Sequence, residues 1–512
     1  GWSFRYVKNL YFPDFDYNQF VVEYWMPSQT NPEKVRHDLL EITDRLKEKY
    51  PQIQRITASQ GSAPARYCLV RPMTNGGDCY GELLVDCEDF NTCSEIIPSL
   101  RAFLRAEYPD AYIRTRRYNF SISTSHTVEV QFKGPDPAVL RRLSAEAEQI
   151  MREAKSVDPY SVQNNWKERN KSLVAYYQQM DGRRTGINRS DVGNALMAAT
   201  DGLTVGALHD KDKIVRINLQ IRNADGSKIQ DLNDVPVWTM MPNINLSDND
   251  MKALLSGGMK ASDVENELFK SSPLSNVTKD LDLAWEEGTV YRYDCMRAIE
   301  AECDPDYDNG SSPVKVQKEI QEKIESIPLP PGYSMRWMGE IKQQAESNEA
   351  LADYYPLTLI IVLTVLLLLF NDWRKVILIL ICLPFVIVGV APALIATGLP
   401  FTFMATIGMA GLMGMMIKNS IVLVDEINRL MTEEGLHPYH AIIQATVARA
   451  NPVIMASATT IVGMLPLVSD PMYGSMAVSI MAGLTMGTII TLMLLPVFYA
   501  IFFKVTKPQT EE

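Results

Sequence analysis

The sequence predicts an α+β membrane protein, in which polar α/β subdomains with an insertion precede a bundle of five transmembrane helices. One observation is the distribution of charge: residues 351–512 hold only 7 of the 49 Lys and Arg and 9 of the 61 Asp and Glu. Another is that this segment contains five apolar stretches, each near the ~20 residues needed to cross a bilayer. A purely soluble protein is therefore excluded. The net charge of −12 argues against a nucleic-acid partner, because phosphate binding requires a basic surface.

The polar region alternates between strand and helix patterns. Strands are predicted at 20–26, 53–57, 83–85, 111–115, 127–132 and 334–337, and helices at 32–50, 93–107, 137–155 and 313–326. Such strand–helix–strand units with short connections imply layered α/β subdomains. A helix at 188–198 with an Asn cap and a hairpin formed by 205–209 and 214–221 are also predicted. Residues 242–280 are interpreted as an insertion with a short helix near 262–270.

Five membrane spans are predicted at about 354–370, 376–397, 401–424, 452–468 and 476–503. The basic residues of the connecting segments all fall on one side, which is therefore cytoplasmic. The polar region then lies outside the cell membrane. Because the chain opens on Gly1-Trp2-Ser3 without an export signal, we interpret it as a fragment that lacks a preceding helix; a cytoplasmic polar region is the alternative.

No enzymatic chemistry is indicated by the motifs. The sequence has neither a G-x4-G-K-[ST] phosphate loop nor a dinucleotide fingerprint. The five His are scattered, and the one close pair, His437 and His440, is interpreted as a solvated loop because Pro438 separates them. We expect no enzymatic activity, no cofactor and no bound metal.

Six of the seven cysteines lie in the polar region, where an oxidising compartment would allow disulfides. Cys87 with Cys93, and Cys295 with Cys303, are close enough in sequence to pair. Unpaired core cysteines are the alternative.

Lys418 is the strongest single indication of function. It lies in an apolar span, seven residues before Asp425 and hence about 10 Å inside that end of the helix. An intramembrane charge is costly unless it is paired, and it suggests a functional site; a lysine reaching the headgroups is the alternative. The neighbouring Asn419 favours a protein-facing position, as do three small residues that permit close helix packing, namely Gly408, Gly411 and Gly414.

The next span offers Ser457 and Thr460 as polar partners, with Arg449 at its start. The alternative for the hydroxyls is a hydrogen bond to their own helix. The Lys418 span also holds a methionine cluster that would suit soft Cu(I), although Met equally fills gaps between helices. This cluster comprises Met404, Met409, Met413, Met415 and Met416.

Six motifs carry a family resemblance: Pro330-Pro331-Gly332-Tyr333, Trp337-Met338-Gly339-Glu340, 411–426, 448–455, 463–467 and 495–498. Together they resemble the C-terminal half of a resistance–nodulation–division (RND) efflux permease of the hydrophobe/amphiphile, multidrug type. The family has twelve helices in two similar halves, so the resemblance implies that this chain holds helices eight to twelve.

The resemblance also implies a domain arrangement. Residues 1–118 would form one periplasmic porter subdomain, 119–183 with 285–345 a second, 184–284 a docking-type insertion, 346–504 the transmembrane domain and 505–512 a cytoplasmic tail. The implied location is the inner membrane of a Gram-negative bacterium, in contact with lipid. The implied partners are an N-terminal half with helices one to seven, two further copies in a homotrimer, a periplasmic adaptor, an outer-membrane channel and small amphiphilic substrates.

By resemblance, protons taken up by an acidic pair outside this chain would be relayed through Lys418 and Asn419, with Arg449 nearby. The family threonine aligns with Ala456, so Ser457 or Thr460 would replace it. The expected function is proton-driven antiport of drugs or amphiphiles. A heavy-metal-exporting relative and a non-transporting, membrane-anchored binding or assembly half are the alternatives. Drug-pocket residues cannot be carried over, because the family's glycine-rich loop is reduced to 61–65.

Overall fold

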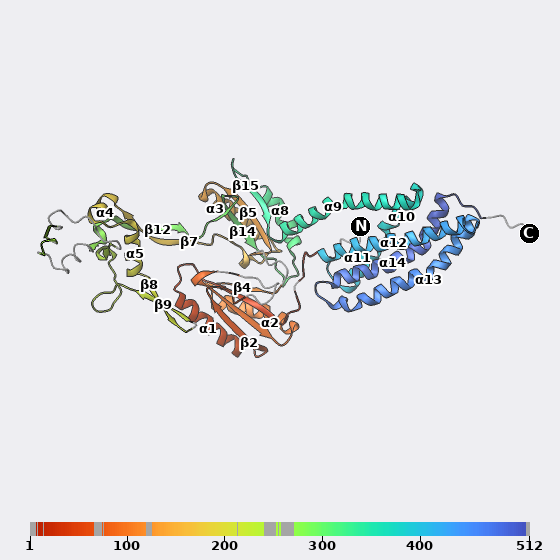
Figure 1. Ribbon diagram of the computed structural model, residues 1–512. Helices are drawn as coiled ribbons and strands as arrows, with labels where there is room; N and C mark the ends of the chain where they lie inside the picture. Colours follow the sequence, from red (N-terminus) through yellow and green to blue (C-terminus); the bar gives the residue numbers. More distant parts are fainter. Residues whose placement is uncertain are drawn as a thin grey trace, which may run out of the picture. The chain divides into compact units, whose positions relative to one another are not determined.

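A computed structural model of the protein shows two compact units, one formed by 1–168 with 288–512 and the other by 169–287 (Figure 1). The structure describes residues 7, 9–13, 15–65, 74, 76–118, 125–211, 213–239, 252–253, 255–257 and 271–507. The helix predicted near 262–270 and Cys68 lie outside the described residues.

The first subdomain is a four-stranded antiparallel sheet covered by two helices. Its elements are β1 (Gln19–Trp25), α1 (Pro32–Lys49), β2 (Ile53–Gln60), β3 (Tyr80–Cys87), α2 (Phe90–Glu107) and β4 (Tyr112–Arg116), and the strand order is β2-β3-β1-β4. Asn31 caps α1 through the Glu33 amide, and Asp89 caps α2 through the Thr92 amide. Buried residues at helical spacing, such as Val35, pack on the sheet face that carries Phe20.

The second subdomain repeats this plan. Its elements are β5 (Val128–Gly134), α3 (Pro137–Glu153), β6 (Gln163–Asn164), β13 (Tyr291–Tyr293), β14 (Met296–Cys303), α8 (Pro313–Glu325) and β15 (Ser334–Met338). The antiparallel path β6-β14-β5-β15 has the order of β2-β3-β1-β4, so each subdomain is a split βαββαβ unit. Trp166 is fully buried there, and its indole N–H donates to the Ala298 carbonyl at 2.7 Å.

The unit formed by 169–287 is inserted between β6 and β14. Its elements are β7 (Arg169–Tyr177), α4 (Gln179–Thr185), α5 (Arg189–Ala199), β8 (Leu203–Asp210), β9 (Lys213–Leu219), β10 (Pro236–Trp238), β11 (Ser271–Pro273) and β12 (Thr278–Glu287). It begins before the predicted 184 because β7 pairs with β12, and neither strand was predicted. The predicted Asn188 cap is present, completed by Asp191 in a capping box.

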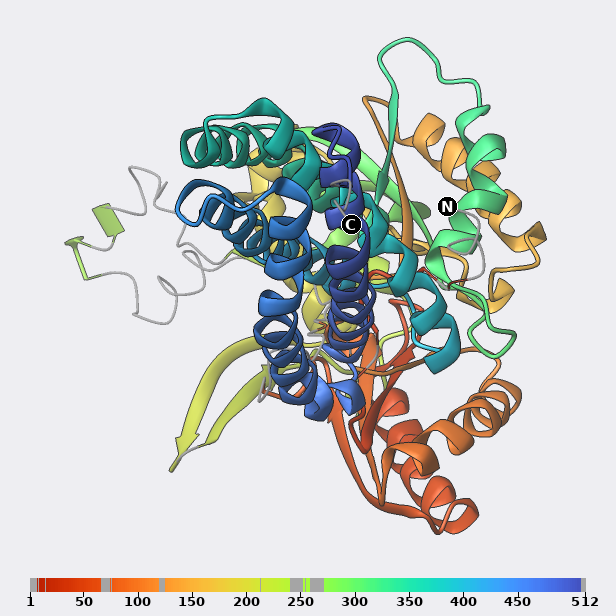
Figure 2. The same cartoon turned by 90° about the vertical axis from the view of Figure 1, so that its right-hand side faces the viewer.

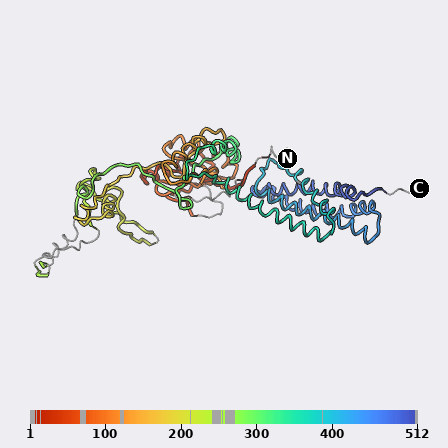
Figure 3. The backbone as a smooth tube through the Cα atoms, turned by 90° about the horizontal axis from the view of Figure 1, so that it is seen from above, coloured from red at the N-terminus to blue at the C-terminus, as the bar shows by residue number. Residues whose placement is uncertain are grey.

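Among the described residues, five helices are long and apolar enough to cross a membrane, as the sequence predicts. They are α9 (Gly339–Phe370), the segment Trp373–Thr397 that contains α10 (Trp373–Ile381) and α11 (Ile387–Thr397), α12 (Phe403–Thr432), the segment Pro438–Ser469 that contains α13 (Pro438–Met464), and α14 (Gly474–Phe502). Figure 3 shows these helices, coloured from teal to blue, running alongside one another.

The helices extend further than predicted through the polar stretch at 425–450. The solvated loop proposed at His437 and His440 was wrong, because His437 caps α13 and His440 lies within it. Pro438 is the first residue of the helix, a position that proline favours since its missing N–H would have no intrahelical partner.

Close backbone approach organises the helix bundle around α14, the dark-blue helix in Figure 2. A Cβ on Gly408 would lie 2.8 Å from Met476 Cγ, and one on Gly487 would collide with Met416. In contrast, only 11% of the apolar, membrane-length stretch is buried in α9, and the same fraction in the segment that contains α13. These two helices therefore present most of their apolar surface outward.

The described cysteines are free thiols, so neither pairing considered from the sequence is formed. Cys295 immediately precedes β14 and Cys303 ends it, so eight residues of extended chain, about 26 Å, separate them. Cys87 and Cys93 are neighbours in the core of the first subdomain, where both are buried as thiols.

Candidate functional site

A cavity of about 500 Å³ lies between the two βαββαβ subdomains. Its walls come from β1 and β4 on one side and from β5, β6 and β14 on the other. Nine acidic or basic side chains line it: Glu23, Glu129, Glu300, Glu302, Arg114, Arg116, Arg292, His126 and Lys167. The cavity is consequently a polar cleft.

Strand alternation directs these side chains into the cleft. On β14, Ile299, Ala301 and Cys303 enter the hydrophobic core, so Glu300 and Glu302 point to the opposite face. On β4, Ile113 is buried among the core residues of its own subdomain. The flanking residues of that strand therefore face the second subdomain.

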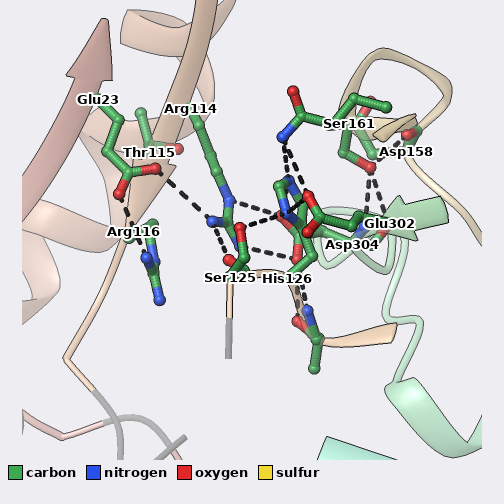
Figure 4. A network of polar contacts seen from close by, with 12 residues as sticks. Glu23, Arg114, Thr115, Arg116, Ser125, His126, Asp158, Ser161, Glu302 and Asp304 are labelled. Atoms are coloured by element: carbon green, nitrogen blue, oxygen red, sulfur yellow. Dashed lines mark hydrogen bonds and ion pairs between the residues drawn. The ribbon is translucent and has the colours of Figure 1, made fainter. Parts of the chain in front are cut away.

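Arg114 is the central contact between the subdomains (Figure 4). Its Nε lies 2.7 Å from Asp304 Oδ2 and its Nη2 lies 2.9 Å from Asp304 Oδ1, a bidentate pair across the cleft. Its Nη1 donates to the Ser125 carbonyl at 2.5 Å and lies 3.6 Å from Glu23 Oε2. The three charged side chains are only 5–12% exposed, so water screens this network weakly.

The surrounding cations keep two of these carboxylates ionised. Burial alone would raise the pKa of Glu23, but the charges of Arg116 and Arg114 outweigh it and lower the pKa. Burial likewise opposes ionisation of Asp304, yet Arg114 holds the pKa of Asp304 far below its usual range. At neutral pH both side chains are therefore negatively charged.

A second pair lies beside this network. His126 Nδ1 is 3.0 Å from Glu302 Oε2, and both side chains are 2% exposed. Burial of Glu302 alone would raise its pKa, but the attraction of His126 and the other neighbouring cations outweighs burial and lowers the pKa of Glu302. The neighbouring Glu129 behaves differently, because burial, reinforced by the Glu302 charge, raises the pKa of Glu129 to about 8. Glu129 is thus protonated at neutral pH.

A smaller cavity of about 310 Å³ borders the same network. Arg114, Arg116 and His126 line both cavities, whereas Asp304 and Arg101 line only the smaller one. The Arg114–Asp304 pair therefore stands between two solvent-accessible spaces.

A further ion pair joins the subdomains without lining either cavity. Arg105 Nη2 lies 2.8 Å from Asp158 Oδ2, and the guanidinium stacks 3.9 Å from the Tyr160 ring centroid. This contact is a purely structural tie, and it is comparable in length with the Arg114 contact.

One group of metal-type ligands occurs among the described residues, at His37, Asp38 and Glu41 on α1. Asp38 already accepts a hydrogen bond from Tyr24 at 2.7 Å, and Glu41 pairs with Arg45 at 2.6 Å. These partners account for the group without an ion.

In the membrane region, Lys418 lies on an exposed face of α12 together with Gly411 and Gly414. A Cβ on either glycine would meet no described atom within 4 Å. Within the described residues Lys418 makes no hydrogen bond or ion pair. Asn419 beside it is half-buried. This face of α12 therefore combines an unpaired cation with two residues that permit close approach by another helix.

The structure does not bring the other candidate relay residues to Lys418. Arg449 Nη2 lies 2.5 Å from Glu426 Oε2, which also binds Arg429, so this cluster joins α12 to α13. The buried Ser457 hydroxyl shares a 2.7 Å hydrogen bond with Thr488 on α14.

Thr460 instead forms a hydrogen bond within its own helix, the alternative that the sequence left open for the span hydroxyls. Its hydroxyl donates to the Ala456 carbonyl of its own helix at 3.0 Å. Of these two hydroxyls, Ser457 thus makes a helix–helix contact and Thr460 an intrahelical bond.

Sequence reasoning missed the cleft residues. A signal was present in Glu300, Glu302 and Asp304, where acidic residues alternate with small apolar ones. This is the period of a strand with one polar face. Arg114, the partner of Asp304, lies 190 residues away from it, a separation at which no local pattern indicates contact.

Comparisons with known proteins identify the family. The model of the AcrB/AcrD/AcrF family matches residues 2–503. The chain belongs to the AcrB/AcrD/AcrF family. One curated relative of this RND permease is the cobalt-zinc-cadmium resistance protein CzcA of Cupriavidus metallidurans, which is 24% identical over 90% of this chain and 42% of that protein. Another is the multidrug resistance protein MdtF of Escherichia coli, which is 29% identical over 38% of this chain and 19% of that protein.

A crystal structure of a heavy metal efflux pump shares the fold of this family member. The TM-score is 0.71 at 17% sequence identity, and the match covers 98% of this chain and 49% of that one. The chain thus spans about half the length of the proteins that it matches.

Proposed function

We propose that this RND permease chain is the C-terminal half of an efflux transporter that exports amphiphilic cations, driven by the proton gradient. In this proposal the cleft between the βαββαβ subdomains receives the cargo, and Lys418 couples cargo movement to protons. The single observation that carries the coupling role is the unpaired Lys418 on the exposed, glycine-bearing face of α12.

The energetics of burial support this role for Lys418. A lysine inside a bilayer is stable only beside carboxylates, polar groups or water. In the proposed pump, the chain that packs on the Gly411–Gly414 face supplies an acidic partner. Protonation of that partner would remove the attraction, and the packing of the helices would change.

The chemistry of the cleft supports cationic, amphiphilic cargo. Glu23 and Glu302 are charged at neutral pH, so their oxygens attract cations. Trp25, Tyr112 and Tyr293 also line the cavity and offer aromatic faces for the apolar part or for a cation–π contact. A strictly apolar substrate would find few aliphatic walls there.

A divalent metal ion is the second candidate cargo. Relatives named for cobalt, zinc, cadmium or nickel resistance, and a neighbouring structure titled as a heavy metal efflux pump, favour it. In this structure Glu302 is paired with His126, and Asp304 beside the cleft is paired with Arg114, so a metal bound by either carboxylate would require that pair to open.

The proposed assembly follows the family pattern. An N-terminal half with helices one to seven would complete the bundle, three copies would form the pump, and a periplasmic adaptor with an outer-membrane channel would continue the path from the inner membrane. The outward apolar surface of α9 and α13 is consistent with further helices packing there.

The decisive test compares Lys418→Ala with Lys504→Ala in the complete permease. Lys504 is an exposed lysine just beyond α14 and serves as the matched control. We expect efflux of the cation ethidium from energised vesicles to be lost in Lys418→Ala and kept in Lys504→Ala, at equal membrane levels by immunoblot. Normal efflux by Lys418→Ala would refute the coupling role.

The same vesicles separate the two cargo classes. Efflux of Zn²⁺ and Co²⁺ is measured beside that of ethidium, each with and without an uncoupler. Uncoupler-sensitive transport of metal without transport of ethidium would replace the organic-cation proposal with the metal one. The absence of both would favour a non-transporting binding or assembly half.

A further inference from the structure

We propose that the Arg114 guanidinium occupies the cation-binding position of the cleft from within, so that a positively charged cargo binds by displacing it. Arg114 would then be a residue that determines specificity, in addition to joining the two subdomains. The inference rests on the proposed function of the cleft as the cargo site.

The contacts of Arg114 are those of a bound organic cation. Its planar head is held by Asp304 in a bidentate pair at 2.7 and 2.9 Å and by the Ser125 carbonyl at 2.5 Å. Glu23 Oε2 completes the surround at 3.6 Å. The guanidinium therefore satisfies a site made of two carboxylates and one carbonyl.

Removal of the guanidinium would leave this site strongly attractive to other cations. Glu23 and Asp304 are ionised and 5% and 12% exposed, and they would lose a principal counter-charge. A buried carboxylate without a partner is costly, so the vacated position should recruit a cation from solution. Arg116 would remain 3.2 Å from Glu23 Oε1, whereas Asp304 would keep the hydrogen bonds from the Thr127 amide and hydroxyl but lose its bidentate guanidinium.

Cargo can reach the position of the guanidinium, because Arg114 lines both the 500 Å³ cavity and the 310 Å³ cavity. A side chain buried on all sides would have nowhere to move. Here the guanidinium can swing into either space while a cation takes its place. A neutral molecule carries no charge to replace the guanidinium beside Asp304, so the site selects cations over neutral cargo.

The test measures equilibrium binding of tetraphenylphosphonium to the complete permease in detergent, without a proton gradient. We expect Arg114→Ala to bind this cation about tenfold more tightly than the wild type. Arg105→Ala is the matched control, because it removes an ion pair between the same subdomains without lining either cavity. Its affinity should equal that of the wild type.

Chemical rescue distinguishes occupancy from structural support. Methylguanidinium should compete with tetraphenylphosphonium in Arg114→Ala, restoring wild-type affinity, and should have no effect on the wild type or Arg105→Ala. Methylurea, which has a similar shape without the charge, should not compete. If Arg114→Ala does not fold, Arg114→Gln replaces it, since the amide retains hydrogen-bond donors for Asp304.

An unchanged or weaker affinity in both Arg114 variants would overturn the inference, as would an equal gain in Arg105→Ala. Competition by methylurea as effective as that by methylguanidinium would also overturn it. Because binding is measured without transport, these outcomes leave the efflux proposal intact. Conversely, failure of the Lys418 efflux test would leave a binding gain in Arg114→Ala valid.

Discussion

Replacing Glu129 with Gln should remove a pH-dependent loss of stability from the second subdomain. Burial beside Glu302 raises the pKa of Glu129 from 4.5 to about 8. Between these two values the unfolded chain binds fewer protons than the folded one, so stability falls as pH rises. Glutamine resembles the protonated carboxyl group in shape and cannot ionise. The variant should therefore keep its stability across this window.

The magnitude follows from the width of the window. One pH unit corresponds to about 1.4 kcal/mol for a single proton, so the interval from 4.5 to about 8 sets an upper limit of about 5 kcal/mol. Below pH 4.5 both states of the wild type are protonated and the difference between wild type and variant should be independent of pH. Above about pH 8 the difference should become constant again.

Hydrogen–deuterium exchange of the β5 peptide, 128–134, provides the assay, because local opening can be measured in a protein that does not unfold in one step. After correction for intrinsic exchange rates, the opening free energy should fall with pH in the wild type and stay level in Glu129→Gln.

Glu319→Gln supplies a control of opposite sign. Hydrogen bonds from Ser156 and the Lys155 amide lower the pKa of Glu319, so its contribution is present above pH 4.5 and is lost as pH falls. A difference between Glu129→Gln and wild type that does not change between about pH 5 and about pH 8 would refute the reasoning.

Three further predictions concern packing and thiol exposure. Gly389→Ala should lower the free energy of unfolding of the bundle, measured by thermal melts, by about 1–3 kcal/mol, because a Cβ there would lie 2.7 Å from a backbone oxygen of α14. Gly463→Ala is the control, since a Cβ at that position would meet no described atom within 4 Å. Ser457→Ala should lower the free energy of unfolding by about 1 kcal/mol in the same melts, because it removes the hydrogen bond to Thr488. A loss of proton coupling without any loss of stability would contradict this structural role. Native Cys295 should react with maleimide, and mass spectrometry should find the buried described cysteines modified only after unfolding.

Local patterns predicted most of the secondary structure because helices and half-buried strands have distinct periods. The missing strands have weak signals: β14 contains Glu and Ala, which have low strand propensity, and β7 and β12 form a two-stranded ribbon rich in polar residues. The extended α12 and α13 were missed because hydropathy marks the membrane-length portion of a helix and not its polar continuation.

The candidate sites were predictable to different extents because sequence patterns reveal local features and not tertiary contacts. Lys418 is conspicuous in the sequence, since a single charge interrupts an apolar span. The Arg114–Asp304 pair joins strands of two subdomains, and only the tertiary fold brings them together. Ser457 and Arg449 stand out in the sequence as polar residues in and just before a span, but their partners, Thr488 and Glu426, could not be chosen from spacing alone.

The position of the inserted unit has a consequence for folding. The second subdomain needs β5 to pair with β14, yet paired residues Gln131 and Glu300 are 169 positions apart. Closing so long a loop is slow, and the sheet cannot form until β14 has been synthesised. The β7–β12 ribbon shortens the search, because the pairing of Arg169 with Glu287 brings the ends of the unit together. The inserted unit should thus fold first, and weakening its ribbon should slow formation of the cleft while leaving the finished cleft unchanged.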